Sequence, residues 1–280
     1  MTSQPRPGAE PVYTPRTPRV VAARKLHARR AREEHRRFLV EGPQAVREAV
    51  ASGVAVEVFG TVEAEERHRA LLDAAVAQGA RRSQVTAEAL ACLAETVHPQ
   101  GLVAVCRHRD VPLAEALAGG PELVAVLVDI RDPGNAGTVL RTADAAGAGA
   151  VVFAGQTVDP YNGKCVRASA GSLFHLDLVR GAEPVAALAA LRAAGLRTLA
   201  AHLRGAADLD RVEAAGGLAA RTAWLFGSEA HGLPEPLAAA ADAVVRVPIH
   251  GRAESLNLAA AAAVCLYASA RAHHAPVEAE

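Results

Sequence analysis

Polar side chains gather at one junction near the C-terminal end of the chain. Residues 247–267 read VPIHGRAESLNLAAAAAVCLY, which is the end of a strand, a turn through Gly251 and an apolar helix rich in alanine. We expect Ser255 to be the N-cap of this helix and Asn257 to lie in its first turn. Because the start of a helix offers unpaired N–H groups and a partial positive charge, Glu254, Ser255 and Asn257 could hold a ligand there. The alternative is a capped core helix with incidental polar neighbours.

A second polar stretch follows an apolar strand in the middle of the chain. Residues 129–144 read DIRDPGNAGTVLRTAD, which is a strand end, a Pro-Gly turn and a helix that begins close to Asn135. Arg141 comes six positions later, nearly two turns into the helix. A guanidinium in an otherwise small and apolar helix needs a partner, and the plain interpretation is a salt bridge to Asp132 or Asp144.

A third stretch, WLFGSEAHGLP over residues 224–234, runs from an apolar strand into a carboxylate between two glycines. Glycines let the backbone approach a ligand closely, although an ordinary turn is the alternative. His231 and His250 are acid or base candidates by type, but a partly exposed loop position is the favoured interpretation of each. The chain has no GxGxxG after a strand, no Walker loop and no HExxH motif.

Composition limits the class of protein. The chain has 280 residues, of which 51% are hydrophobic, enough for two cores of unequal size. Its net charge is zero, but nine Lys and Arg residues fall within residues 16–37 and create a local positive field. Four scattered cysteines without CxxC spacing indicate reduced thiols, so neither a disulfide nor a metal site is expected. No apolar run is long enough for a membrane span and no signal-peptide pattern is present, which predicts a soluble cytoplasmic protein.

The order of the patterns predicts two α/β domains. Residues 1–15 contain four prolines and are expected to be a disordered tail, and residues 273–280 are expected to be a C-terminal tail. Residues 16–108 alternate helices and short strands, which predicts a small three-layer domain that starts with one arginine-rich helix at 19–37. Further helices are expected at 43–52, 65–78 and 87–95. A segment with prolines and glycines at 109–121 is the expected linker.

Residues 122–272 predict a doubly wound parallel sheet. The fully apolar run LVAVLV at 123–128 is typical of a parallel strand that is buried on both faces. A helix is expected over 183–194. Further strands are expected at 150–153, 173–179, 197–201, 222–226 and 243–247. Ligands bind beyond the carboxyl ends of such strands, which is where the three polar stretches fall.

Taken together, in their order and spacing, the three stretches resemble the three motifs of the SpoU-type RNA ribose methyltransferases of the SPOUT superfamily. Residues 164–174 (KCVRASAGSLF) resemble the family's segment between the first and second motifs. Residues 38–43 (FLVEGP) and 98–105 (HPQGLVAV) resemble its auxiliary RNA substrate-binding domain, which is related to a ribosomal protein. The resemblance covers residues 17–272. It implies a homodimer with a C-terminal trefoil knot that transfers methyl from S-adenosylmethionine to a ribose 2′-hydroxyl of RNA.

The resemblance also implies roles for individual residues. A ribose hydroxyl must be aligned with the methyl group, and its proton must be removed or its developing charge stabilised. We interpret Arg141 as a phosphate clamp and charge stabiliser, because a guanidinium almost never loses its proton, and Glu229 or a relayed water as the better proton acceptor. The catalytic site would be lined by Asn135, Arg141, Glu229, Ser255 and Asn257. The backbone around Gly227, Val247, Ile249 and Leu256 would hold the cofactor.

The arginine-rich segment is then interpreted as a surface that contacts RNA phosphates without reading bases. Its alternative is a solvated helix face. The candidate RNA-binding residues are Arg24, Lys25, Arg29, Arg30 and Arg167. Ser169 is a further candidate for an RNA or cofactor contact.

The RNA target stays open at this point. The auxiliary domain favours 23S ribosomal RNA over transfer RNA, and both housekeeping and self-protection against a ribosome-targeting antibiotic are compatible roles. One rival is a catalytically inactive RNA-binding member of the fold, whose signature would be the loss of Asn135, Arg141, Glu229 or Asn257; none of these is lost. Another is a methyltransferase that acts on a different RNA atom or on protein.

Overall fold

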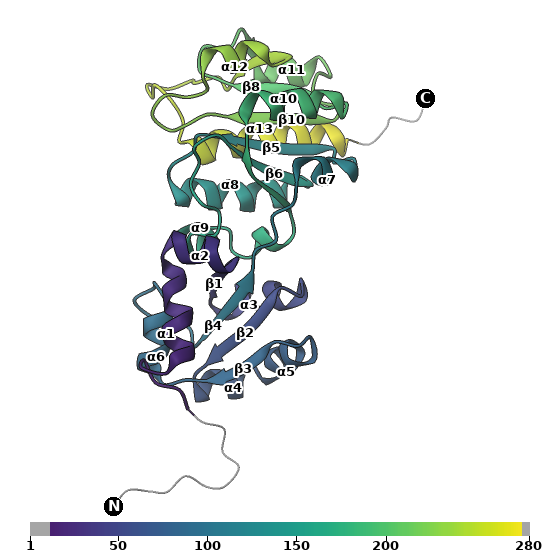
Figure 1. The fold of residues 1–280 in the computed structure, drawn as a ribbon. Helices are drawn as coiled ribbons and strands as arrows, with labels where there is room; N and C mark the ends of the chain where they lie inside the picture. The colour runs from purple at the N-terminus through teal and green to yellow at the C-terminus, as the bar shows by residue number, and fades with distance from the viewer. Residues whose placement is uncertain (1–11, 276–280) are drawn as a thin grey trace, which may run out of the picture. The chain divides into compact units, whose positions relative to one another are not determined.

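A computed structural model describes residues 12–275, which form two compact units (Figure 1). Unit 1 contains the residues up to His108 together with Tyr161–Gly163, and unit 2 contains the others from Arg109 onward. The expected tails fall largely on residues 1–11 and 276–280, which lie outside the described residues.

Unit 1 is a four-stranded sheet with helices on both faces. Its strand order is β1-β4-β2-β3, in which β4 runs antiparallel to both neighbours and β2 and β3 are parallel. The strands are β1 (Arg37–Glu41), β2 (Ala55–Gly60), β3 (Arg81–Gln84) and β4 (Leu102–Arg107). Helices α3 (Pro43–Ala51) and α5 (Arg69–Ala77) pack together, and so do α1 (Pro18–Arg24) and α6 (Ala87–Leu93). The second pair covers a core that includes Val20, Leu26, Phe59, Leu90 and Val103.

The arginine-rich segment is not the single helix that the sequence predicted. It forms α1, a 3₁₀ turn η1 (Lys25–His27) and α2 (Arg29–His35). The break falls at Ala28, whose backbone is extended, with φ −82° and ψ 131°. Arg32 is buried beside this break and donates to the carbonyls of Leu26 and His27, at 3.0 and 2.7 Å. Arg32 therefore stabilises the interruption, which an arginine-rich pattern alone does not reveal.

Three further details of unit 1 differ from the prediction. The helix expected at 65–78 is two helices, α4 (Val62–Arg67) and α5, separated by the non-helical His68. Strand β3 was not expected, because its sequence RRSQ lacks an apolar pattern. Tyr13, placed in the predicted tail, is ordered: its N–H donates to the carbonyl of Gln84 at 2.8 Å and its carbonyl accepts from Thr86.

Unit 2 is a parallel sheet of seven strands in the order β7-β6-β5-β10-β8-β11-β9. The strands are β5 (Leu123–Val128), β6 (Ala150–Ala154), β7 (Asp177–Ala182), β8 (Arg197–Ala201), β9 (Ala207–Asp208), β10 (Thr222–Phe226) and β11 (Ala243–Arg246). From β5 the chain first builds outward to β7 and then fills the other side. The order therefore reverses between β5 and β10, and such a switch point is where doubly wound sheets bind ligands.

The core of unit 2 explains why β5 is apolar at every position. Val124, Val126 and Val128 face a cluster completed by α7 (Leu113–Ala118), α10 (Pro184–Ala193) and α12 (Glu235–Ala240). On the other face, α8 (Pro133–Ala145) and α13 (Leu258–His273) pack against each other and against β5. Alternate residues of β5 are thus buried on opposite faces of the sheet, as in a central parallel strand. Among the described helices, none is both long and apolar enough to cross a membrane.

Parts of unit 2 also depart from the prediction. The expected linker contains α7, and its Ala116 is buried in the core, because LAEALA has an apolar helical face. The strand expected at 173–179 is a 3₁₀ turn, η2 (Ser172–Phe174), followed by β7. The last helix begins at Leu258 with Asn257 as its N-cap, so the prediction of Ser255 as the N-cap was wrong. Remaining helices are α9 (Gly163–Ala168) and α11 (Leu209–Ala214).

Candidate active site

The loops that follow β5 and β10 meet at the switch point of the sheet, where Glu229 joins them. Its Oε1 accepts from the Nδ2 of Asn135 at 3.0 Å and from the N–H of Asp132 at 3.2 Å. Its Oε2 accepts from the N–H of Arg131 at 3.2 Å. One carboxylate of the stretch 224–234 therefore binds both the turn and the helix start of the stretch 129–144.

Asn257 brings the remaining stretch to the same point. Its Nδ2 donates to the Oδ1 of Asn135 at 3.1 Å. Its Oδ1 accepts from the N–H groups of Ala259 and Ala260, at 2.9 and 3.4 Å, and so caps α13. The side-chain amide of Asn135 is thereby fixed from both ends, since it donates to Glu229 and accepts from Asn257. Three stretches that are far apart in the sequence thus form one hydrogen-bonded chain.

A tight hairpin presents Glu229 to this chain. Ser228 and Gly232 exchange two backbone hydrogen bonds, at 3.1 and 2.9 Å. Gly227 is buried directly before the hairpin, and a Cβ at this position would overlap the backbone of Gly232 and Leu233. The glycine that sequence analysis assigned to cofactor binding therefore also has a structural role, because it lets the hairpin fold back on the end of β10.

The start of α8 is held by Asp132. Its Oδ1 accepts from the N–H of Asn135 at 2.8 Å, which is an N-cap, and Pro133 occupies the first helical position. Its Oδ2 accepts from the Nζ of Lys164 in α9 at 2.9 Å. The hydrogen bond from Lys164, together with that from the Asn135 N–H, lowers the pKa of the Asp132 carboxyl below its ordinary value.

The environment of Glu229 decides which chemistry this carboxylate can do. Partial burial alone would raise its pKa, but the hydrogen bonds from the Asn135 side chain and from the N–H groups of Arg131 and Asp132 outweigh that effect, and the pKa is lowered. A carboxylate that is stabilised in its charged form by three donors is a weak proton acceptor. The geometry therefore favours Glu229 as the group that orients Asn135.

Arg141 lies on the exposed face of α8, about two turns from Asn135. Neither carboxylate that sequence analysis considered as its partner is bonded to it, because Asp132 binds Lys164 and Asp144 binds His175 at 2.8 Å. Within residues 12–275 Arg141 forms no hydrogen bond or ion pair. Its guanidinium is therefore available to a ligand on that face of the helix.

The loop between β11 and α13 contains the other predicted cofactor residues. Val247 and Ile249 are half-buried, and Leu256 is 38% exposed. Across 248–256 no backbone N–H or carbonyl is hydrogen-bonded to another group of the described residues. Ser255 is exposed and is not part of the chain of side chains that Asn135, Glu229 and Asn257 form. The loop thus presents backbone N–H and carbonyl groups that have no partner among the described residues, next to apolar side chains.

The predicted RNA-binding residues fall into two units. In unit 1, four of them are exposed, and they are Arg24, Lys25, Arg29 and Arg30. Other basic residues of that segment are used inside the unit: Arg19 pairs with Glu57 at 3.3 Å, and Arg32 is buried. In unit 2, Arg167 lies on α9 and is half-buried, whereas Ser169 is buried and donates to the carbonyl of Val166.

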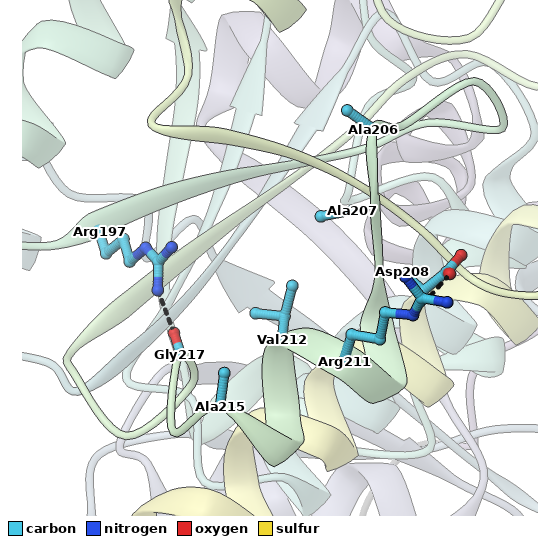
Figure 2. A pocket seen from close by; sticks show the side chains of 8 residues that line it. All are labelled: Arg197, Ala206, Ala207, Asp208, Arg211, Val212, Ala215 and Gly217. Carbon is cyan, nitrogen blue, oxygen red and sulfur yellow. Dashed lines mark hydrogen bonds and ion pairs between the residues drawn. The ribbon is translucent and has the colours of Figure 1, made fainter.

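A separate hollow of about 400 Å³ lies between β8, β9 and α11 (Figure 2). Its charged side chains are bonded within the chain: Arg197 donates to the carbonyl of Gly217, and Asp208 pairs with Arg211 and Arg246. No residue of the three motif stretches lines it, so it is not part of the candidate site. Within residues 12–275 no group of His, Cys, Asp and Glu side chains is arranged to hold a metal ion.

Comparisons with known proteins agree with this geometry. Residues 122–267 match the model of the SpoU rRNA Methylase family, and residues 17–104 match an MRM3-like substrate binding domain. The chain belongs to the SpoU rRNA methylase family. A relative in this family, the 23S rRNA (guanosine(2553)-2′-O)-methyltransferase RlmP of Bacillus subtilis, is 34% identical over 87% of this chain and 92% of its own length.

Two solved methyltransferase structures are similar to this chain over most of its length. The AdoMet-bound rRNA methyltransferase of Sinorhizobium meliloti superposes with a TM-score of 0.82 at 33% identity, covering 92% of this chain and 95% of that one. The SpoU methyltransferase AviRb of Streptomyces viridochromogenes, in complex with AdoMet, gives 0.79 at 29% identity, covering 91% and 98%. The expected α/β fold and the family resemblance are therefore confirmed.

Sequence reasoning missed two residues at the site. Asp132 was considered only as a partner of Arg141, although an Asp directly before a Pro at a helix start is an N-cap signal. Lys164 had no local signal, because its partner is 32 positions earlier in the sequence and the contact depends on how α9 packs against α8. The N-cap role of Asn257 was also missed.

Proposed function

We propose that this protein transfers a methyl group from S-adenosylmethionine to a ribose 2′-hydroxyl of 23S ribosomal RNA. The observation that carries the proposal is the hydrogen-bonded chain of Glu229, Asn135 and Asn257, which joins the three SpoU motifs at the switch point of the sheet. Named SpoU relatives of this chain are 23S rRNA 2′-O-methyltransferases, and two of its structural neighbours hold AdoMet.

The loop 247–256 fits the cofactor that the family implies. Its free backbone groups can bind the polar edge of an adenine, and the half-exposed Leu256 can cover the apolar face of the ring. Val247, Ile249 and the backbone around Gly227 complete the proposed binding surface. When bound there, S-adenosylmethionine supplies an electrophilic methyl group.

The polar residues then have the task of positioning the ribose oxygen. In-line attack on a methyl group requires alignment, and alignment alone can supply much of the rate. Glu229 and Asn257 hold the Asn135 amide in one orientation, so Asn135 can direct the ribose. Arg141 remains charged and clamps the adjacent phosphate, where its planar fork can donate two hydrogen bonds. Ser255, exposed two residues before Asn257, completes the proposed set.

Unit 1 is proposed to bind the RNA backbone. Its match to a substrate binding domain and the exposed Arg24, Lys25, Arg29 and Arg30 support this role. Arginine and lysine contacts to phosphates give affinity without base specificity. Arg167 on α9 is proposed to contribute from unit 2. A bacterial-type ribosomal RNA substrate would place the protein in the cytoplasm.

A homodimer, and the trefoil knot that the resemblance implies, form part of the same proposal. On α13, Val264 and Tyr267 are 42% and 44% exposed, which is unusual for large apolar side chains on a helix that packs beside α8. A second copy of the chain would cover them. We expect Val264→Asp to lower the molecular mass in solution to that of a monomer. Val185→Asp, at a 62% exposed site on α10, should leave the dimer intact; dissociation by both variants or by neither would contradict this interface.

Mapping of 2′-O-methyl groups in total RNA tests the substrate. Cells that lack the gene should lose methylation at a ribose of 23S rRNA, and the wild-type gene should restore it. If a methyl group is lost from transfer RNA instead, the substrate is tRNA and not ribosomal RNA. Unchanged maps for every RNA would favour the rival interpretation of an inactive RNA-binding member.

A further inference from the structure

We infer that Lys164 is a positioning residue for methyl transfer, which acts on Asn135 through Asp132. The inference rests on the proposed function and adds a residue to that site. The Nζ of Lys164 donates to one carboxylate oxygen of Asp132, at 2.9 Å, and the other oxygen accepts from the N–H of Asn135, at 2.8 Å. Lys164 is thus connected to the Asn135 backbone by two successive hydrogen bonds.

The same peptide turn is also bound by Glu229. The N–H of Asp132 and the side chain of Asn135 both donate to Glu229 Oε1, at 3.2 and 3.0 Å. The Asp132 carboxylate and the Glu229 carboxylate therefore bind the start of α8 together. If the Asp132 side chain rotates, the cap on Asn135 is lost and only the contacts to Glu229 and Asn257 remain. Lys164 opposes that rotation, because it fixes the second oxygen.

Glycines in α8 allow α9 and the Lys164 side chain to approach closely. A Cβ at Gly134 would lie 3.1 Å from the Cε of Lys164, which is closer than ordinary van der Waals contact. The same Cβ would lie 3.4 Å from the Nζ of Lys164. A Cβ at Gly137 would overlap the carbonyl of Cys165 and the Cβ of Ala168. The two helices therefore approach at backbone distance, and this approach places Lys164 over the start of α8.

Exposure limits what the ion pair does for stability. The side chains of Lys164 and Asp132 are 57% and 42% exposed, and ion pairs of this kind contribute little to the free energy of unfolding. The effect on turnover can be larger, since a displacement of about 1 Å at a reacting group can lower a rate by roughly 100-fold. Removal of the pair should consequently change turnover much more than melting temperature.

A double-mutant cycle tests this role. We expect Lys164→Met and Asp132→Asn each to lower kcat about 10-fold, with unchanged affinity for 23S rRNA fragments. Because both act through one bond, the double variant should be no slower than the slower single variant. Lys164→Arg should recover most of the rate. Hydrogen exchange at residues 131–136 should become faster in Lys164→Met, a readout that does not depend on activity.

A matched control is the ion pair of Arg192 and Asp242, which is 2.6 Å long and comparably exposed, at the opposite ends of the strands. Arg192→Met should leave kcat unchanged. Additive effects in the cycle would overturn the inference. A weaker RNA affinity of Lys164→Met with a smaller salt dependence would also overturn it, and would make Lys164 a direct phosphate contact. An inactive wild-type protein would instead refute the proposed function.

Discussion

Glu229 is the residue on which the geometry of the site depends most. Its two oxygens accept from the N–H groups of Arg131 and Asp132 and from the side-chain amide of Asn135, and the same bonds lower its pKa. From sequence alone it was interpreted as a proton acceptor. The observed contacts favour a different use, in which an ionised carboxylate fixes the orientation of Asn135.

Replacement of Glu229 by Gln should therefore disturb the hydrogen bonds of the site, although the side chain keeps its shape. The new NH₂ group would face at least one N–H donor, which leaves that donor unsatisfied. We expect a fall in kcat of about 10- to 100-fold, measured as single-turnover methylation of rRNA. Glu235→Gln, on the exposed first turn of α12, is the control and should keep the wild-type rate. Equal rates for Glu229→Gln and the wild type would remove Glu229 from the positioning set.

The low pKa of Glu229 also predicts how stability depends on pH. A carboxylate whose folded pKa is depressed adds stability above its ordinary pKa of 4.5, and the contribution is lost as the pH falls through the folded value. The difference in melting temperature between the wild type and Glu229→Gln should be constant from pH 8 to about 5 and should shrink at lower pH. A difference that grows on acidification would contradict this assignment.

The sequence predicted residue types better than residue roles. The polar set was predicted because Asn135, Glu229 and Asn257 fall in three stretches that follow predicted strands and that resemble the SpoU motifs. The capping role was assigned to Ser255, which precedes the helix by three residues, because Ser is a preferred cap and the start of α13 cannot be located from an alanine run. The pairing of Lys164 with Asp132 has no sequence periodicity, since it arises from tertiary packing.

At the scale of elements, α13 has one residue that serves both the helix and the site. Asn257 caps the helix through Oδ1 and binds Asn135 through Nδ2. Asn257→Asp keeps the cap and removes the donor, so we expect near wild-type stability but little activity. Asn257→Ala should lose activity and in addition about 1 kcal/mol of unfolding free energy. Chemical denaturation together with a methylation assay separates the two effects; an active Asn257→Asp variant would show that the bond to Asn135 is dispensable.

Close packing of α8 and α9 is a second requirement of the elements. Gly137→Ala would push a methyl group into Cys165 and Ala168, and we expect a loss of about 1–3 kcal/mol in unfolding free energy together with lower turnover. Gly119→Ala is the control, because its Cβ would meet nothing within 4 Å and its φ of −70° suits alanine. Denaturant titration of both variants measures the difference, and a Gly137→Ala variant as stable as Gly119→Ala would exclude this packing.

Strands and helices were predictable to different degrees for physical reasons. Buried strands such as β5 and β6 have continuous apolar runs, so their positions agree with the prediction. Strand β3 is polar and α7 lies in a segment with prolines and glycines, so each depends on tertiary contacts. The helix break at Ala28 depends on the buried Arg32, which looked in the sequence like one more solvated arginine.

At the scale of the whole molecule, one unit is proposed to bind RNA and the other to do the chemistry. Each phosphate contact that is removed should lower the slope of log affinity against log salt by about 0.7 to 0.9. We expect Arg29→Gln and Arg30→Gln to weaken binding of 23S rRNA fragments and to reduce that slope, without a change in kcat at saturating RNA. Arg192→Gln should leave the slope unaltered. A slope that is the same in all three variants would remove these arginines from the RNA contact.

The most direct test of the central claim is the position of the transferred methyl group. Purified protein, incubated with 23S rRNA and S-adenosylmethionine that carries a deuterated methyl group, should yield a labelled 2′-O-methylnucleoside after complete digestion and mass spectrometry, whereas Asn257→Asp should yield little or none. A label on a base, or no label in any RNA, would contradict the account.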